Sequence, residues 1–213
     1  MEKSNTYDFK TVESKWRNFW ETEGIFKFDS KLKAKVYSVD TPPPTVSGKM
    51  HIGHAFSYSQ QDFVVRYHRM KGENVFYPFG TDDNGLPTER LIEKLKNVKS
   101  TKMQRQEFVE LCQKTIKEIK SDFIYDWKRI GMSCDFSNTY STIDPHCIRT
   151  SQKSFIDLFK KNLVYQHEAP TMWCVQCQTA IAQADLEDKE LDSTFNDIQF
   201  ELENGEKIVI ATT

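Results

Sequence analysis

The spacing of apolar side chains predicts helices that alternate with short strands. Apolar runs at 36–40 and 74–79 are typical of buried strands, and residues 131–142 are predicted to be irregular. The first strand, the helix after it and the second strand form a βαβ unit, so we expect an α/β fold with a parallel sheet and a right-handed crossover. The predicted helices cover 8–24, 53–71, 87–96, 105–130 and 145–162.

Three of these helices carry an apolar stripe that we expect to face a core. The stripes are Phe9, Val12, Trp16, Phe19 and Trp20; Phe108, Cys112, Ile116, Ile119, Phe123 and Trp127; and Ile148, Phe155, Leu158 and Phe159. Near the end of the chain the pattern becomes β-like, because Ile198, Phe200 and Leu202 alternate with polar residues. The pair Asn204-Gly205 then predicts a two-residue hairpin turn.

Length and charge narrow the possible functions. A chain of 213 residues can bury the core of one or two domains, and a net charge of −2 gives no reason to expect DNA as a partner. RNA contacts would require local basic patches. The absence of a long apolar run and of a signal peptide predicts a cytoplasmic protein with no membrane partner. Three dispersed cysteines, Cys112, Cys134 and Cys147, are expected to be buried or partly buried thiols.

The most specific chemical pattern is His51-Ile52-Gly53-His54. Three consecutive prolines in the preceding run 41–48 exclude a helix there, so both imidazoles stand on the first turn of the next helix. That turn offers unpaired backbone N–H groups and the positive end of the helix dipole, which suit a phosphate. Gly53 lets a flat base or a ribose approach the backbone. Two histidines at this spacing can alternatively be metal ligands or ordinary surface residues.

A second candidate group follows the second predicted strand, where ligands bind in open α/β sheets. Asp82, with Asp83 and Asn84 beside it, can bind an α-ammonium group through charge-assisted hydrogen bonds. The alternative is a turn acid that caps the helix beginning near Pro87.

A third group is the pair Cys174 and Cys177, which has the spacing of half a zinc site. A redox pair is the alternative, although the neighbouring residues do not resemble a thioredoxin active site. His167 is a possible third ligand, and the sequence offers no clear fourth ligand.

The histidine motif resembles the HIGH signature of the class I aminoacyl-tRNA synthetases, and other nucleotidylyl transferases carry a looser version. Three longer segments together are similar to the valyl-tRNA synthetases within this class, namely 42–56, 80–89 and 173–187. The triple proline and the run Thr-Ala-Ile-Ala-Gln-Ala favour valine over isoleucine or leucine. An isoleucyl or leucyl synthetase, a small nucleotidylyl transferase, a truncated non-catalytic paralogue that acts as a binding module, and a zinc-ribbon interaction protein remain alternatives.

The resemblance implies a set of site residues, substrates and parts. It implies that ATP, with Mg²⁺, is bound by Thr45, His51, Gly53 and His54, with His51 and His54 catalytic. It implies that valine is bound by Pro42, Thr45 and Asp82, that zinc is held by Cys174 and Cys177, and that tRNA(Val) is the acceptor. The implied parts are an N-terminal helical extension (1–35), the first half of a Rossmann-like catalytic domain (36–163), a partial zinc ribbon (164–190) and the start of an editing domain (191–213).

The chain also departs from the pattern of this family. It has no KMSKS-like motif and no partner zinc cysteines, and synthetases of this kind are far longer than 213 residues. We therefore expect an N-terminal fragment that by itself activates valine poorly or not at all. The final run 208–213 is similar to the opening of the editing domain, where a second hydrolytic site removes threonine, because an apolar pocket discriminates poorly between valine and threonine.

Overall fold

The computed structural model of the protein describes residues 7–186 and 188–213, and the chain divides into two units, Met1–Gln166 and His167–Thr213. The helices are α1 (Phe9–Thr22), α2 (Ile52–Met70), α3 (Leu86–Lys96), α4 (Arg105–Arg129) and α5 (Pro145–Lys160), with short 3₁₀ turns at Ser100–Lys102 and Gln183–Asp185. The strands are β1 (Val36–Ser38), β2 (Asn74–Phe76), β3 (Pro78–Thr81), β4 (Asp135–Ser141), β5 (Trp173–Cys174), β6 (Thr179–Ala180), β7 (Asn196–Glu201) and β8 (Lys207–Thr212). The finer division of the chain into four parts remains a prediction.

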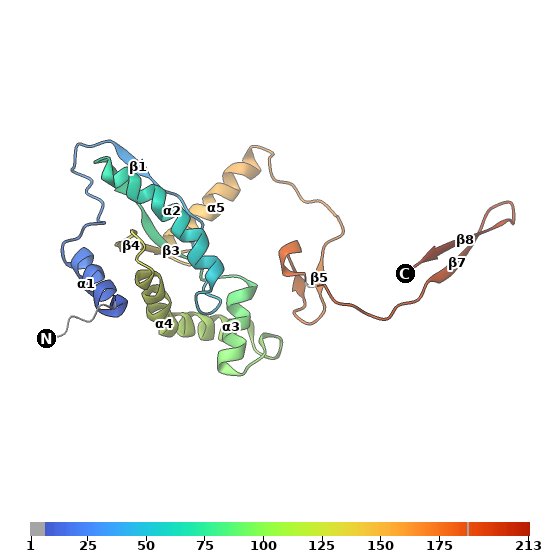
Figure 1. The fold of residues 1–213 in the computed structure, drawn as a ribbon. Coiled ribbons are helices and arrows are strands. Elements are labelled where there is room, and N and C mark those ends of the chain that lie inside the picture. Colours follow the sequence, from blue (N-terminus) through green and yellow to red (C-terminus); the bar gives the residue numbers. More distant parts are fainter. Residues whose placement is uncertain (1–6, 187) are drawn as a thin grey trace. The chain divides into compact units, whose positions relative to one another are not determined.

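Two parallel strand pairs in the first unit confirm the α/β class. β1 pairs with β2, and β3 pairs with β4, while helices α2, α3 and α4 lie around these strands (Figure 1). The sequence predicted one strand over 74–79, and the structure instead breaks the run at Tyr77. The run changes partner at this point, since Val39 N donates to Phe76 O at 2.9 Å and Asp135 N donates to Tyr77 O at 2.8 Å.

Strand β4 lies where the sequence was expected to be irregular, and that prediction is wrong. Phe136 and Tyr140 are the large hydrophobic residues of the strand, and its three central residues are exposed, so no period of two is visible. Pairing with β3 defines the strand instead. The Tyr140 ring lies over Gly80, where an added Cβ would come within 2.2 Å of the Tyr140 Cζ atom, so a larger residue there would force the ring to move.

Helix α4 supplies the centre of the core, and the stripe predicted for it is confirmed. Phe108, Ile116, Phe123 and Trp127 are buried, and Cys112 and Ile119 are half-buried. The Trp127 side chain is 0% exposed. Its ring centroid lies 4.6 Å from that of Tyr58 on α2 and 5.9 Å from that of Phe79 on β3. Trp127 therefore joins α2, α4 and the strands.

A polar network fixes α2 against the residues that lead into β4. The buried Asp62 carboxylate accepts hydrogen bonds from Ser133 N at 2.8 Å and from the Ser133 hydroxyl, and it pairs with Arg66 Nε at 2.6 Å. Arg69 donates to the Ser133 hydroxyl at 2.6 Å and to the Ser133 carbonyl at 2.7 Å. Burial of the Arg69 guanidinium lowers its pKa below the ordinary value, and the Asp62 charge opposes that shift.

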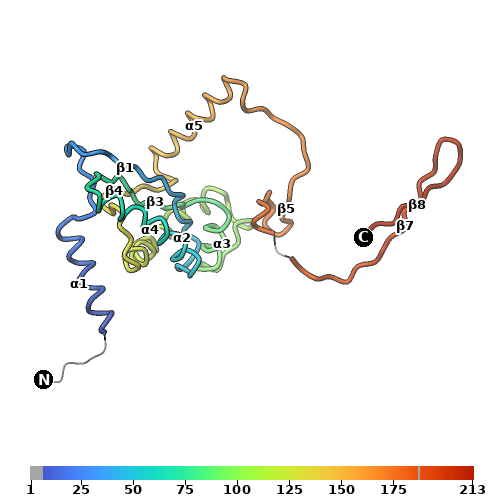
Figure 2. Tube along the Cα trace, turned by 45° about the horizontal axis from the view of Figure 1, so that its top comes forward, coloured from blue at the N-terminus to red at the C-terminus, as the bar shows by residue number. Residues whose placement is uncertain are grey.

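Other apolar faces of the first unit are exposed. Helix α5 extends from β4 away from the strands (Figure 2). It has no buried residue, so the prediction that its stripe points inward is wrong. Helix α1 also has no buried residue. It contacts α4 through an ion pair between Glu21 and Lys128 and through Arg17 over the Tyr125 ring. On α2 the buried residues are Asp62 and Val65, and the exposed large side chains are Ile52, Phe56, Phe63, Val64, Tyr67 and Met70.

The second unit contains two antiparallel strand pairs, β5–β6 and β7–β8. The hairpin β7–β8 was predicted, and its loop differs from the expected two-residue turn. Leu202 N donates to Glu206 O at 2.8 Å, and Gly205 N donates to Leu202 O at 2.9 Å. Three residues therefore form the loop, and Gly205, with φ of +83°, takes the left-handed position that such loops require. None of the helices in the described ranges combines the length and apolarity needed to cross a bilayer.

Candidate functional site

The first part of the site is the N-terminus of α2, where the proline-rich run ends and the helix begins. His51 is the N-cap residue with extended backbone angles (φ −120°, ψ 169°), and its Nδ1 accepts a hydrogen bond from His54 N at 3.4 Å. The two imidazoles stack with their centroids 3.8 Å apart and their planes 22° apart. The predicted helix start is confirmed, and both rings lie together on its first turn.

Gly53 lies directly below the His51 ring. A Cβ at position 53 would lie 3.0 Å from the Cε1 atom of the His51 ring, which is closer than ordinary van der Waals contact. The sequence assigned Gly53 to the approach of a ligand. The structure adds a second reason for glycine, since a larger residue would require the His51 ring to shift slightly.

His54 lies deeper than His51. Its ring is half-buried, and its centroid is 5.6 Å from that of Trp127. Burial lowers the pKa of His54 below its ordinary value, and the nearby charge of His51 lowers it further. Within the described residues, its Nδ1 atom is buried without a hydrogen-bond partner. A neutral imidazole can donate one hydrogen bond to an anionic oxygen.

The second part of the site is Asp82, which directly follows β3. The segment after β1 runs alongside it, because Asp82 N donates to Pro44 O and Val46 N donates to Asp82 O, both at 2.9 Å. The carboxylate accepts hydrogen bonds from the Thr45 hydroxyl at 3.4 Å and from the Thr142 hydroxyl at 3.0 Å. The loops after β1, β3 and β4 therefore meet at this carboxylate, at the carboxyl end of the strands.

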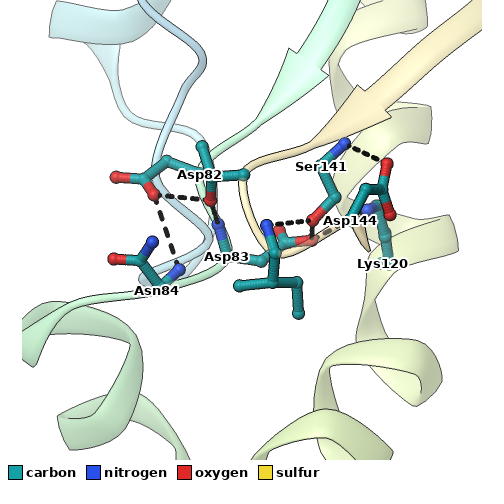
Figure 3. A network of polar contacts seen from close by, with 8 residues as sticks. Asp82, Asp83, Asn84, Lys120, Ser141 and Asp144 are labelled. Atoms are coloured by element: carbon teal, nitrogen blue, oxygen red, sulfur yellow. Dashed lines mark hydrogen bonds and ion pairs between the residues drawn. The ribbon is translucent and has the colours of Figure 1, made fainter. Parts of the chain in front are cut away.

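Asp83 faces the interior and has a different environment. Its side chain is 1% exposed and pairs with Lys120 Nζ of α4 at 2.8 Å. It also accepts a hydrogen bond from the Ser141 hydroxyl. Figure 3 shows Asp82 and Asn84 on one side of the Asp83 backbone and Ser141, with Lys120 behind it, on the other. The charge of Asp83 is thus compensated inside the protein.

The two parts of the site lie at the same edge of the strands. The Tyr58 hydroxyl of α2 donates to Pro42 O at 2.6 Å. This bond connects the helix to the run 41–48, which contains Thr45 and is hydrogen-bonded to Asp82. Tyr58 and His54 also share Trp127 as a neighbour. A groove of about 780 Å³, lined by Trp16 and Trp20 among others, borders His51 on the side of α1.

The sequence indicated Pro42, Thr45, His51, Gly53, His54 and Asp82, and the structure brings them to this edge. The sequence did not indicate Tyr58, Lys120 or Thr142. Thr142 lies just after a strand that shows no periodic pattern, and Lys120 is one of many charged residues on α4. Only their contacts with the site distinguish them.

The cysteine pair lies in the second unit, with Cys174 at the end of β5 and Cys177 in the turn that leads to β6. Cys177 N donates to Cys174 Sγ at 3.3 Å. Within residues 7–186 and 188–213 no three His, Cys, Asp or Glu side chains form a group that could hold a metal. Structural zinc takes four ligands, so the described residues supply half of such a site, and the predicted zinc is not supported further.

Comparisons with known proteins agree with the family indicated by the motifs. A family model described as tRNA synthetases class I (I, L, M and V) matches residues 15–202. The valine–tRNA ligase of Rickettsia prowazekii (strain Madrid E) is 49% identical over 208 residues, which cover 97% of this chain and 26% of that protein. The valine–tRNA ligase of Rickettsia felis is 46% identical over 202 residues, which cover 94% of this chain and 24% of that protein.

Among solved structures, the LeuRS of Agrobacterium radiobacter K84, crystallised in a ternary complex with tRNA and LeuAMS, superposes with a TM-score of 0.63 at 27% identity. The match covers 84% of this chain and 21% of that one. This chain therefore spans about a quarter of the length of the relatives that it matches. The resemblance to valyl-tRNA synthetases is confirmed, and the family model shows that the chain belongs to the class I tRNA synthetases of the isoleucine, leucine, methionine and valine group.

Proposed function

We propose that this chain carries the valine- and ATP-binding part of a valine–tRNA ligase. The observation that carries the proposal is the convergence of the paired imidazoles at the N-terminus of α2 and the Asp82 carboxylate at one edge of the strands. The similarity to valine–tRNA ligases over 97% of the chain supports valine as the amino acid. The assignment of roles to individual residues is part of the proposal.

The proposed reaction is the activation of valine. An oxygen of the valine carboxylate attacks the α-phosphorus of ATP, a new C–O–P linkage forms, and the bond to the β-phosphate oxygen breaks to release pyrophosphate. ATP enters as its Mg²⁺ complex. No protein side chain forms a covalent bond, so the protein must align the two substrates and stabilise negative charge on the phosphoryl oxygens.

Each part of the site suits one of these tasks. The backbone N–H groups at the start of α2 and the two imidazoles can donate to phosphate oxygens. Asp82 can hold the α-ammonium group of valine, which places the carboxylate of the amino acid toward the phosphates. Thr45 borders Asp82, and Pro42 and Thr45 would shape the pocket for the valine side chain.

Later steps belong to the longer protein that the relatives represent. We propose that the activated valine is transferred to tRNA(Val) and that mischarged threonine is removed by an editing site. Valine and threonine are nearly isosteric, and an apolar pocket that separates such ligands by only about 100-fold leaves a need for a second hydrolytic site. The hairpin β7–β8 would belong to that editing part.

The test is calorimetric binding of aminoacyl-sulfamoyl adenosines, which mimic the aminoacyl adenylate, to the purified chain. The valyl compound is expected to bind more tightly than the isoleucyl, leucyl and threonyl compounds. Tighter binding of the leucyl or isoleucyl compound would reassign the amino acid. If none of the four compounds binds, this chain does not hold the site.

A further inference from the structure

The network behind Asp82 starts from strand β4. Thr81 and Ser141 are paired in the register of β3 and β4, and Thr142 N donates to Thr81 O at 3.0 Å. Strand pairing therefore sets Thr142 beside the residue that follows β3, which is Asp82.

One hydroxyl group connects the two acidic residues. The Thr142 hydroxyl donates to Asp82 Oδ1 at 3.0 Å and accepts from Asp83 N at 3.0 Å. The other contacts of the Asp82 carboxylate are longer, at 3.4 Å from the Thr45 hydroxyl and 3.5 Å from Asn84 N. Thr142 thus makes the shortest hydrogen bond to this carboxylate among the described residues.

The turn that carries Thr142 is itself held in place. Ser141 N donates to Asp144 Oδ2 at 2.8 Å, and Asp144 N donates to Ser141 O at 3.0 Å. The Ser141 hydroxyl donates to the buried Asp83 carboxylate, which is paired with Lys120. Figure 3 shows this chain of contacts from Lys120 through Asp83 and Ser141 to Asp144.

The two neighbouring acids consequently differ in charge compensation. Lys120 neutralises Asp83, whereas Asp82 is only partly buried and forms no ion pair within the part of the chain that the structure describes. A carboxylate has about four acceptor positions. The three hydrogen bonds described above therefore leave the Asp82 carboxylate able to accept a further hydrogen bond from a cationic group. Asp82 is therefore the charge that faces a ligand, and Asp83 belongs to its support.

Building on the proposed function, we propose that Thr142 is a positioning residue that orients the Asp82 carboxylate toward the α-ammonium group of the amino acid. Thr142 does not touch the substrate. It acts by fixing one oxygen of the Asp82 carboxylate, so that the other oxygen faces the ammonium group. The Lys120–Asp83–Ser141 chain holds Thr142 in the geometry that this requires.

The test measures how much affinity the α-amino group contributes. Dissociation constants for valyl-sulfamoyl adenosine and for its counterpart without the amino group are measured calorimetrically with the whole chain. The ratio of the two constants isolates the contact of Asp82 with the ammonium group. In Thr142→Val, which keeps the shape and removes the hydroxyl, this ratio is expected to fall about tenfold, equivalent to 1.4 kcal/mol.

Two variants serve as controls. Thr142→Ser restores a hydroxyl and should keep the wild-type ratio. Thr139→Val makes the same substitution at an exposed position of β4 and should leave both constants unchanged. If circular dichroism shows that Thr142→Val is not folded, Thr142→Ala takes its place with the same expected result.

The outcomes separate this inference from the proposed function. An unchanged ratio in Thr142→Val, or an equal loss of affinity for both compounds, would overturn the positioning role, since damage to the fold weakens both. A wild-type chain that binds both compounds equally would instead contradict the assignment of Asp82 to the amino group. A wild-type preference that Thr142→Val selectively removes supports both.

Discussion

The buried Asp62 carboxylate, which pairs with the partly exposed Arg66, gives the sharpest prediction about stability. Both residues lie on α2, and Asp62 is 5% exposed. Its carboxylate accepts two hydrogen bonds from Ser133, which is 0% exposed. In Asp62→Ala these two donors lose their acceptor in the interior, and Arg66 loses its ionic partner.

The magnitude follows from these contacts. A buried donor left unsatisfied costs about 1–3 kcal/mol, and Asp62→Ala leaves two such donors, Ser133 N and the Ser133 hydroxyl. The Arg66 side chain is 35% exposed, so solvent screens most of the loss of its ionic partner. Alanine favours a helix over aspartate by about 0.7 kcal/mol at most, which offsets little of this loss. Arg66 keeps its bond to the Gly131 carbonyl. With two donors left unsatisfied, we therefore expect Asp62→Ala to lower the free energy of unfolding by about 2–6 kcal/mol.

A matched control lies on α5. Asp157 forms an ion pair with Lys161 at the same spacing of four residues, and the two side chains are 58% and 60% exposed. The same substitution, Asp157→Ala, should change the free energy of unfolding by less than about 0.5 kcal/mol, since solvent screens exposed pairs. Comparing these two variants separates burial from the ion pair itself.

The measurement is equilibrium unfolding in urea, followed by tryptophan fluorescence. Trp127 is fully buried in the first unit and reports on its unfolding. If Asp62→Ala does not fold, Asp62→Asn, which keeps an acceptor for Ser133 N, should show an intermediate loss. A change in Asp62→Ala of less than about 1 kcal/mol, similar to that of an ordinary surface substitution, would refute the reasoning from burial.

Three further predictions concern single side chains. Burial lowers the pKa of His54 below 6.5. As the pH falls below 6.5, the unfolded chain therefore binds a proton at His54 more readily than the folded chain does, and the folded state loses stability. An NMR titration midpoint of His54 at or above 6.5 would contradict this. Burial raises the pKa of the Cys134 thiol to about 12, so a thiol reagent at pH about 8 should modify it only after denaturation, because the thiolate is the reactive form. Gly80→Ala should cost about 1–3 kcal/mol through its clash with Tyr140, and the cost should shrink when Tyr140→Ala is combined with it.

The sequence predicted the helices well because their stripes are strong. Helix α4 shows this most clearly, since its period of apolar residues matches the side that faces Trp127 and its neighbours. The apolar residues of α5 have a similar period and are exposed. Periodicity indicates which side chains favour burial, and it does not indicate whether the covering surface lies among the described residues.

The sequence predicted the site less completely than the helices. The histidine pair and Asp82 stand in motifs and at recognisable ends of elements, so their positions could be inferred. Strand β4 could not, because its central residues are exposed and its pairing with β3 is a long-range contact. Thr142 depends on that pairing, and so does its contact with Asp82. Lys120 reaches Asp83 across 37 positions of sequence, a separation at which no local pattern applies.

The first turn of α2 and Asp82 are proposed to form a single site for one ligand. The most direct measurement is an NMR titration of the chain with valyl-sulfamoyl adenosine, followed at the backbone amides. We expect the signals of His51, Gly53, His54 and Asp82 to shift together with one dissociation constant. Shifts at the histidines without any response at Asp82, or two unrelated dissociation constants, would contradict the claim.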